Sequence, residues 1–350
     1  MSDITILNGT YEGGITHQFP NGSYIGNLSL IMFPHNCTLQ TCDLTMASFE
    51  YLPTVAGNGI YAGIFGLAIL AQLFLGIKHK TWGYMVAMLF GLLLEVIGYV
   101  ARILIHNNPF DNNNFLMYLI CLTIAPAFLT AAIYLCLSRI VIVYGPEHSR
   151  FKPGTYTIVF CTCDIISLIL QAAGGAIAST ADTHEQSDTG KNIMLAGLGF
   201  QVFSIILFVL ACSEFALRVR KAKGMWNPIY LSLVNSAFFK AFMAALALAT
   251  TTIFVRSTYR CIELSGGFHG SLFVSHEEEF MVLEGVMIVL ATLALTIFHP
   301  GVSFKGAWNE LNFKFRGNGK ASHERVKSGA ESMLSSGGDV EMGVLKQNRR

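Results

Sequence analysis

The stretch from Pro53 to Ile77 reads PTVAGNGIYAGIFGLAILAQLFLGI and contains no charged residue. A membrane-spanning helix needs about 20 consecutive, mostly apolar residues, so this stretch is long enough to cross a bilayer. Its apolar run is continuous, whereas strands of a membrane β-barrel alternate apolar and polar residues over about ten positions. The stretch therefore predicts a transmembrane helix.

Six further stretches of the same kind follow, and they predict an all-α, polytopic membrane protein. The third carries Pro126 near its middle and is expected to be kinked or tilted. The sixth is the least apolar, because Lys240 lies inside it. The seven predicted helices cover residues 53–77, 82–104, 116–143, 156–179, 193–217, 235–256 and 279–299. They divide the chain into an N-terminal tail (1–52), a membrane domain (53–302) and a disordered C-terminal tail (303–350).

The composition supports a membrane protein over other classes. Hydrophobic residues make up 53% of the 350 residues and charged residues only 13%, about half the charged share of a soluble domain. This excludes a soluble enzyme, a disordered protein and a secreted disulfide scaffold. The net charge is +1, so no global field indicates a nucleic-acid partner.

Lysine and arginine alternate between the two sides of the predicted membrane. They occur in the first, third and fifth connections and in the C-terminal tail, and are absent or sparse in the N-terminal tail and the other connections. Because cytoplasmic segments carry the excess of positive charge, the N-terminus is expected outside the cell and the C-terminus in the cytoplasm. We expect a multi-pass protein of the plasma membrane, with an endomembrane or the vacuolar membrane as alternatives.

The N-terminal tail has features of an extracellular segment. It contains four N-glycosylation sequons, which begin at Asn8, Asn21, Asn27 and Asn36. Three cysteines, Cys37, Cys42 and Cys261, fall on the predicted outer side, where disulfides persist. A bridge from Cys37 or Cys42, either between the two or to Cys261, is the expected pairing.

Motifs for catalysis are missing from the sequence. No phosphate-binding loop occurs, since Gly190-Lys191 and Gly319-Lys320 both lack the upstream glycine. Only one of the ten histidines, His299, falls in a predicted span, so intramembrane zinc is not expected, and there is no G-x-S-x-G nucleophile elbow. We therefore expect no enzyme, no metal, no cofactor and no direct ATP site.

Ionisable side chains inside the spans are the candidates for function, because a charge in the bilayer is costly. Glu95 and Arg102 lie seven residues apart in the second span, so they share a helix face about 10 Å apart along the axis. Asp164 and Gln171 repeat this spacing in the fourth span, and Glu284 lies in the outer third of the seventh. These five residues form the predicted substrate-binding set.

Each of these candidates also has a structural interpretation. Glu95 and Asp164 could form structural pairs instead of a substrate site, and Arg102 could anchor the fold. Gln171 and Gln201 could join helices by hydrogen bonds. Five other polar residues near helix ends are expected to reach or pair at the membrane interface: Arg139, Glu214, Lys240, Arg256 and His299.

Several motifs resemble one family. Glu95-Val-Ile-Gly-Tyr-Val-Ala-Arg102, Ala125-Pro126-Ala127, Asp164 to Gln171, Arg256-Ser-Thr-Tyr-Arg260 and His299-Pro300-Gly301 resemble the fungal lipid-translocating exporters of the aminocholesterol-resistance type. The resemblance covers residues from about Tyr51 to Gly306. Within that family, Ile120 to Pro126 and Leu295 to Gly301 are most similar to the transporters of sphingoid long-chain bases. Ser138, Glu278 and Glu284 depart from the usual Gly, Trp and Asp.

The resemblance implies seven helices and a role in lipid or amphiphile export, with resistance to toxic amphiphiles. We expect an exporter of sphingoid bases or similar cationic amphiphiles toward the extracytoplasmic leaflet, with membrane lipids as its partners. Acidic groups at mid-membrane suit a cationic cargo. The alternative is a seven-helix receptor or regulator that senses such lipids.

The N-terminal tail is predicted to be glycosylated on at least one of its four sequons. All four lie more than a dozen residues from the first predicted span, within reach of the modifying enzyme. Treatment of the natively expressed protein with a deglycosylase should increase its gel mobility. An unchanged mobility, with the tail protected from protease in intact cells, would reverse the predicted orientation.

Overall fold

The computed structural model describes residues 9–11, 14–18, 24–25, 47, 51–181, 183–222, 228–266, 277–306 and 308. Within them, seven helical segments are long and apolar enough to cross a membrane, as predicted. They are α2 (Val55–His79), α3 (Trp82–Asn107), α4 (Asn112–Tyr144), α5 (Pro153–Ser179), α6 (His184–Lys221), α8 (Ala237–Ser265), and a seventh made of α10 (Glu277–Phe280), the π-helical turn η5 (Met281–Val286), α11 (Met287–Ile297) and α12 (Pro300–Ser303).

Short elements complete the described chain. The connections contain η3 (Pro146–His148), η4 (Pro228–Tyr230) and α7 (Leu231–Val234). The N-terminal segment contains three antiparallel strands in the order β1-β2-β3, in which Thr10 pairs with Ile15 and His17 with Ile25. These strands, which were not expected from the amino-acid sequence, are β1 (Gly9–Tyr11), β2 (Gly14–Gln18) and β3 (Tyr24–Ile25).

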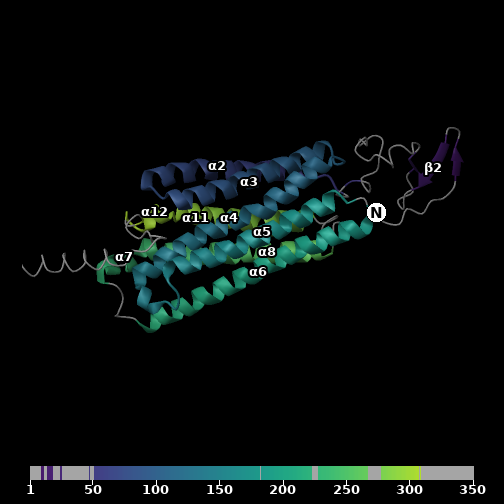
Figure 1. Ribbon diagram of the computed structural model, residues 1–350. Coiled ribbons are helices and arrows are strands. Elements are labelled where there is room, and N and C mark those ends of the chain that lie inside the picture. The colour runs from purple at the N-terminus through teal and green to yellow at the C-terminus, as the bar shows by residue number, and fades with distance from the viewer. Residues whose placement is uncertain are drawn as a thin grey trace, which may run out of the picture. The chain divides into compact units, whose positions relative to one another are not determined.

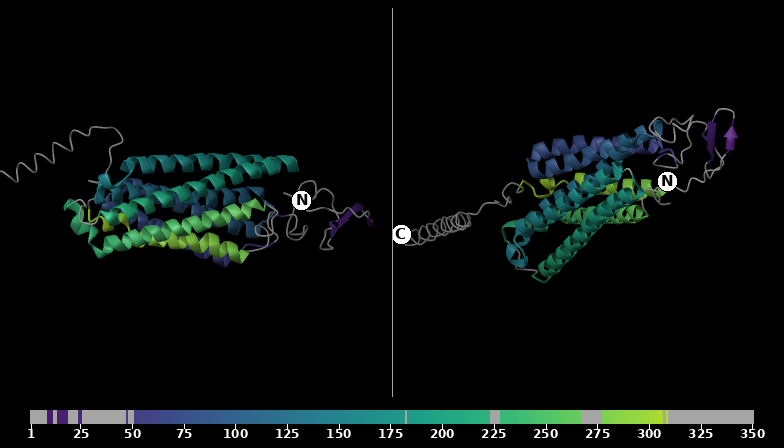
Figure 2. Two further views of the ribbon diagram at one scale, coloured as in Figure 1. Left: turned by 90° about the horizontal axis from the view of Figure 1, so that it is seen from below. Right: turned by 45° about the vertical axis from the view of Figure 1, so that its right-hand side comes forward.

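Helix α4 is the central element of the bundle. The long helices run side by side (Figures 1 and 2), and α4 packs against α3, α5 and α8, while α2 packs on α3 and α11. In its most apolar window 67% of α4 is buried, against 22–50% for the other spans. The outer helices instead expose large apolar side chains such as Leu67, Ile169 and Leu210, as expected of surfaces that face lipid.

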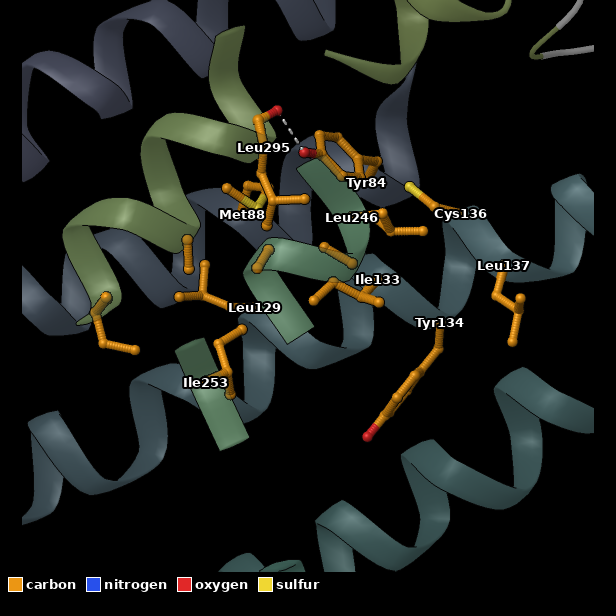
Figure 3. Packing of buried hydrophobic residues seen from close by; sticks show 14 of the residues in the cluster. Tyr84, Met88, Leu129, Ile133, Tyr134, Cys136, Leu137, Leu246, Ile253 and Leu295 are labelled. Atoms are coloured by element: carbon orange, nitrogen blue, oxygen red, sulfur yellow. Dashed lines mark hydrogen bonds between the residues drawn. The ribbon is translucent and has the colours of Figure 1, made fainter. Parts of the chain in front are cut away.

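Side chains from α3, α4, α8 and α11 meet in the apolar core. Figure 3 shows Leu129 and Ile133 of α4 beside Ile253 of α8. The hydroxyl of Tyr84 donates a 2.9 Å hydrogen bond to the carbonyl of Leu295, so even this buried phenol finds a partner. Such pairing is needed where no water can satisfy a polar group.

The two ends of the bundle are named by their residues. The end that holds Tyr51 and Glu277 is called the outer end, because the charge pattern predicts that it faces outward. The opposite end, at Tyr144 and Lys221, is called the inner end. The orientation itself stays a prediction. So do the sequons and cysteine pairings, because Asn8, Asn21, Asn27, Asn36, Cys37 and Cys42 lie outside the described residues.

Two glycines bring α5 and α6 into close contact. A Cβ atom at Gly174 would lie 2.6 Å from the Gly190 carbonyl oxygen, and one at Gly190 would lie 2.7 Å from the Gly174 carbonyl oxygen. Both clashes are with backbone, which no change of rotamer relieves. Small residues commonly permit such close crossings in membranes.

Gly174→Ala is therefore expected to destabilise the protein by about 1–3 kcal/mol, the range for overpacking. The matched control is Gly175→Ala, because a Cβ there meets nothing within 4 Å. Loss of helicity during titration of mixed micelles with SDS measures both variants. Equal stability of the two would show that the glycine contact does not constrain the α5–α6 distance.

Candidate functional site

Charged side chains gather inside the outer half of the bundle. Six of them are at most 3% exposed. They lie in the interior of a bundle whose outer surface is apolar. With the partly buried Glu277 they are called the charged cluster, which consists of Glu95 and Arg102 of α3, Arg256, Arg260 and Glu263 of α8, Glu277 of α10, and Glu284 of η5.

Arg256 links three helices at the centre of this cluster. It forms an ion pair with Glu284 and donates a hydrogen bond to the backbone carbonyl of Leu122 in α4. That carbonyl is available because Pro126, four residues later, has no N–H to donate to it. The proline thus creates an acceptor inside the membrane domain, and the guanidinium satisfies it.

Glu284 is placed by a π-helical turn. The turn Met281–Val286 interrupts the regular α-helix of the seventh span, and such turns are frequent at functional sites. It is fixed against α2 by the Tyr61 hydroxyl, which donates a 2.7 Å hydrogen bond to the Met281 carbonyl. The adjacent Gly285 allows the Tyr61 ring to approach, since a Cβ there would lie 2.6 Å from the ring.

Arg102 lies at the outer edge of the cluster. Its Nε donates to the Asn58 amide oxygen and its Nη2 to the Tyr51 hydroxyl, both at 3.1 Å. The Glu277 carboxylate is 3.9 Å away, and the Phe280 ring centroid lies 3.9 Å from the guanidinium carbon. Arg102 is therefore held by several partners at once. Glu284 is not among these partners, because it pairs with Arg256.

Arg260 and Glu263 form the third pair. Their side chains are 2.7 Å apart, and Arg260 also donates to the Tyr118 hydroxyl at 3.1 Å. Each of the three arginines in the cluster thus has a glutamate beside it. The cluster contains a fourth glutamate, Glu95, which is 1% exposed and whose Oε1 has no hydrogen-bond partner. Arg256 attracts this carboxylate and Glu284 repels it.

Asp164 and Gln171 occupy a separate location. Asp164 Oδ2 accepts a 2.9 Å hydrogen bond from Thr130 of α4, while its Oδ1 has no partner. Gln171 donates to Ser167 at 2.7 Å and to Gln201 of α6 at 3.1 Å, which matches the helix-joining interpretation. Because α4 packs between α3 and α5, the sequence-predicted set divides into one group around Glu95 and another around Asp164.

Three residues that were expected to reach or pair at the membrane interface point into the bundle. Arg256, Arg139 and His299 are all buried, and Arg256 pairs with Glu284. Arg139 stacks on the Trp308 ring at 3.7 Å, and His299 accepts a 3.1 Å hydrogen bond from the Gly301 N–H. Lys240, in contrast, is exposed as expected.

Helical spacing could have identified the three residues of α8 that belong to the charged cluster but were not among the predicted substrate-binding residues. Arg256, Arg260 and Glu263 follow the i, i+4, i+7 pattern of a single helix face.

Among the described residues, no group of three or more His, Cys, Asp or Glu side chains could hold a metal ion.

Comparison with known proteins places this geometry in context. Residues 88–307 match the model of the RTA1-like protein family. The chain is 34% identical to the sphingoid long-chain base transporter RSB1 of Saccharomyces cerevisiae, over 73% of this chain and 74% of that protein. From the same organism, protein RTM1 is 30% identical over 63% of this chain and 68% of its own. Protoporphyrin uptake protein 1 is 29% identical over 59% and 65%. No solved structure matches.

Arg256→Gln is predicted to be among the most destabilising single changes. It leaves the buried Glu284 carboxylate without its cation, which typically costs about 3–5 kcal/mol. The double variant Arg256→Gln/Glu284→Gln should recover part of this loss, because the isolated charge is then removed. Unfolding of the purified protein by SDS measures the coupling as a double-mutant cycle.

The control is Arg218→Gln, which removes an exposed partner of Glu214 and should change stability little. If the effects of the two buried changes simply add, the ion pair does not hold the outer half together.

Proposed function

The chain belongs to the RTA1-like protein family, and from this premise we propose that it is an exporter of sphingoid long-chain bases. It is a multi-pass membrane protein, and the similarity to a sphingoid long-chain base transporter supports this cargo. The proposed direction is toward the extracytoplasmic leaflet of the plasma membrane. Such export gives resistance to toxic amphiphiles.

The observation that carries the proposal is the surplus carboxylate Glu95. A sphingoid base has an ammonium group on a long alkyl chain. Moving that ion out of water costs several kcal/mol unless an opposite charge compensates. Glu95 offers this charge at the middle of α3, where the arginines nearby are already paired with other glutamates. A buried carboxylate retained without a cation of its own is what a cationic cargo requires.

Asp164 provides a second acceptor for the same chemistry. It is 3% exposed, and no described cation pairs with it; its Oδ1 and the Gln171 Oε1 both lack hydrogen-bond donors. An ammonium carries three N–H donors, and hydroxyl groups of the cargo could reach the remaining acceptors. We infer that the headgroup contacts the Asp164 group and the Glu95 group at different stages of its passage.

Proton exchange offers a source of energy without ATP. A carboxyl group in an apolar medium favours its neutral form when no cation is near. Binding of the ammonium would then release the proton, and proton return would release the cargo. We propose that Arg256, which attracts the Glu95 carboxylate, helps to release the cargo by competing with its ammonium group. Arg102 and Glu284 hold the surrounding cluster in place.

Glu95→Gln and Asp164→Asn are each expected to slow export by about tenfold or more, the usual effect of losing a charged hydrogen bond. Both substitutions keep the size of the side chain, so expression should remain normal. The measurement is transfer of a labelled sphingoid base across liposomes that contain the purified protein. Glu214→Gln, an exposed carboxylate near the inner end, is the matched control.

Two outcomes would contradict the proposal. Export at the parental rate by both variants would make the carboxylates structural. Binding of the base to the parental protein without its translocation would favour a lipid-sensing receptor or regulator instead of an exporter.

A further inference from the structure

An apolar cavity of about 390 Å³ lies between α4, α6 and α8. Its volume falls in the range of small-molecule sites. Four hydroxyl-bearing residues line it, Tyr144, Ser213, Thr250 and Thr251. The last three each donate their hydroxyl to a carbonyl of their own helix at 2.8–2.9 Å. Apart from Tyr144 and Arg220 near the inner end, the wall therefore consists mainly of apolar groups and suits a hydrocarbon chain.

The cavity has the depth of one membrane leaflet. Along α6 it is lined from Phe208 to Arg220, which corresponds to about 18 Å of helix. Half of the roughly 30 Å hydrocarbon core is about 15 Å. The lining on α4 ends at Tyr144 and that on α8 begins at Met243, so the cavity runs from the inner end of the bundle to its middle.

Arg220 is the one charged residue in this lining. It is exposed and lies one residue before the end of α6, where lipid headgroups are expected if this helix spans the membrane. The neighbouring Arg218 and Arg150 both pair with Glu214, at 2.6 Å and 3.3 Å. Within the described part of the chain, Arg220 has no such carboxylate. Among the described residues it is thus a cation without a paired carboxylate, at the mouth of an apolar slot.

We propose that this cavity binds a membrane phospholipid with an anionic headgroup, whose acyl chain fills the slot and whose phosphate pairs with Arg220. Basic pockets between helices on the cytoplasmic side are a known mode of lipid recognition. A cationic cargo is disfavoured here, because Arg220 would repel its ammonium. No residue of α3 lines this cavity, so the site is separate from Glu95 and does not depend on the identity of the cargo.

The test uses full-length protein in detergent and tritiated dioleoyl phosphatidate in a scintillation proximity assay. Arg220→Gln should weaken binding by about fivefold, the effect of one basic residue at an anionic surface, and Arg220→Lys should retain it. Arg218→Gln, at a paired arginine outside the lining, should have little effect. Added salt should weaken binding to the parental protein more than to Arg220→Gln.

A second pair of variants tests the chain-binding slot. Ala247→Phe places a large ring in the cavity, at a position that is not part of the packed core, and should reduce phosphatidate binding. Ala244→Phe, which is exposed but outside the lining, should not. Equal binding by Arg220→Gln and the parental protein would overturn the proposal, as would equally tight binding of phosphatidylcholine. Displacement of phosphatidate by a sphingoid base would instead assign the cavity to the cargo.

Discussion

The missing N–H of Pro126 leaves the Leu122 carbonyl without a helical donor inside the membrane domain, and Arg256 supplies one. The same guanidinium neutralises Glu284, so one side chain of α8 joins α4 to the seventh span. In an apolar medium it is costly to leave either the carbonyl or the carboxylate unpaired. The relative placement of these three helices, and therefore the geometry around Glu95, depends on this junction.

Charge pairing separates structural from functional candidates in the outer half. Three arginines and three glutamates are paired, two of the pairs between helices and Arg260–Glu263 within α8, which accounts for their burial without any ligand. Glu95 and Asp164 are not accounted for in this way, since no described cation pairs with either. Buried carboxylates of this kind are expensive to retain, and a cationic headgroup would offset that cost.

The two ends of the bundle offer different chemistry to a lipid. Toward the outer end the interior is polar and holds its charges between helices. Toward the inner end, α4, α6 and α8 enclose an apolar slot with a basic residue at its mouth. The first arrangement suits a charged headgroup that enters the interior, and the second suits an acyl chain whose headgroup stays at the surface. The central helix α4 borders both, which gives it the largest buried share among the spans.

The sequence by itself determined the seven helices, because a long apolar segment in lipid must satisfy its backbone hydrogen bonds internally. It also identified Glu95 and Asp164, because ionisable residues at mid-span are rare. Only the tertiary structure decided their partners. Because Arg256 lies at the end of its predicted span, its side chain was expected at the membrane interface. The packing of α8 instead points this side chain into the bundle. The π-turn sets the direction of Glu284, and α4 separates Glu95 from Asp164. The depth of a residue in the membrane follows from its position along the helix. The direction of its side chain and the residues that it contacts follow from how the helices pack.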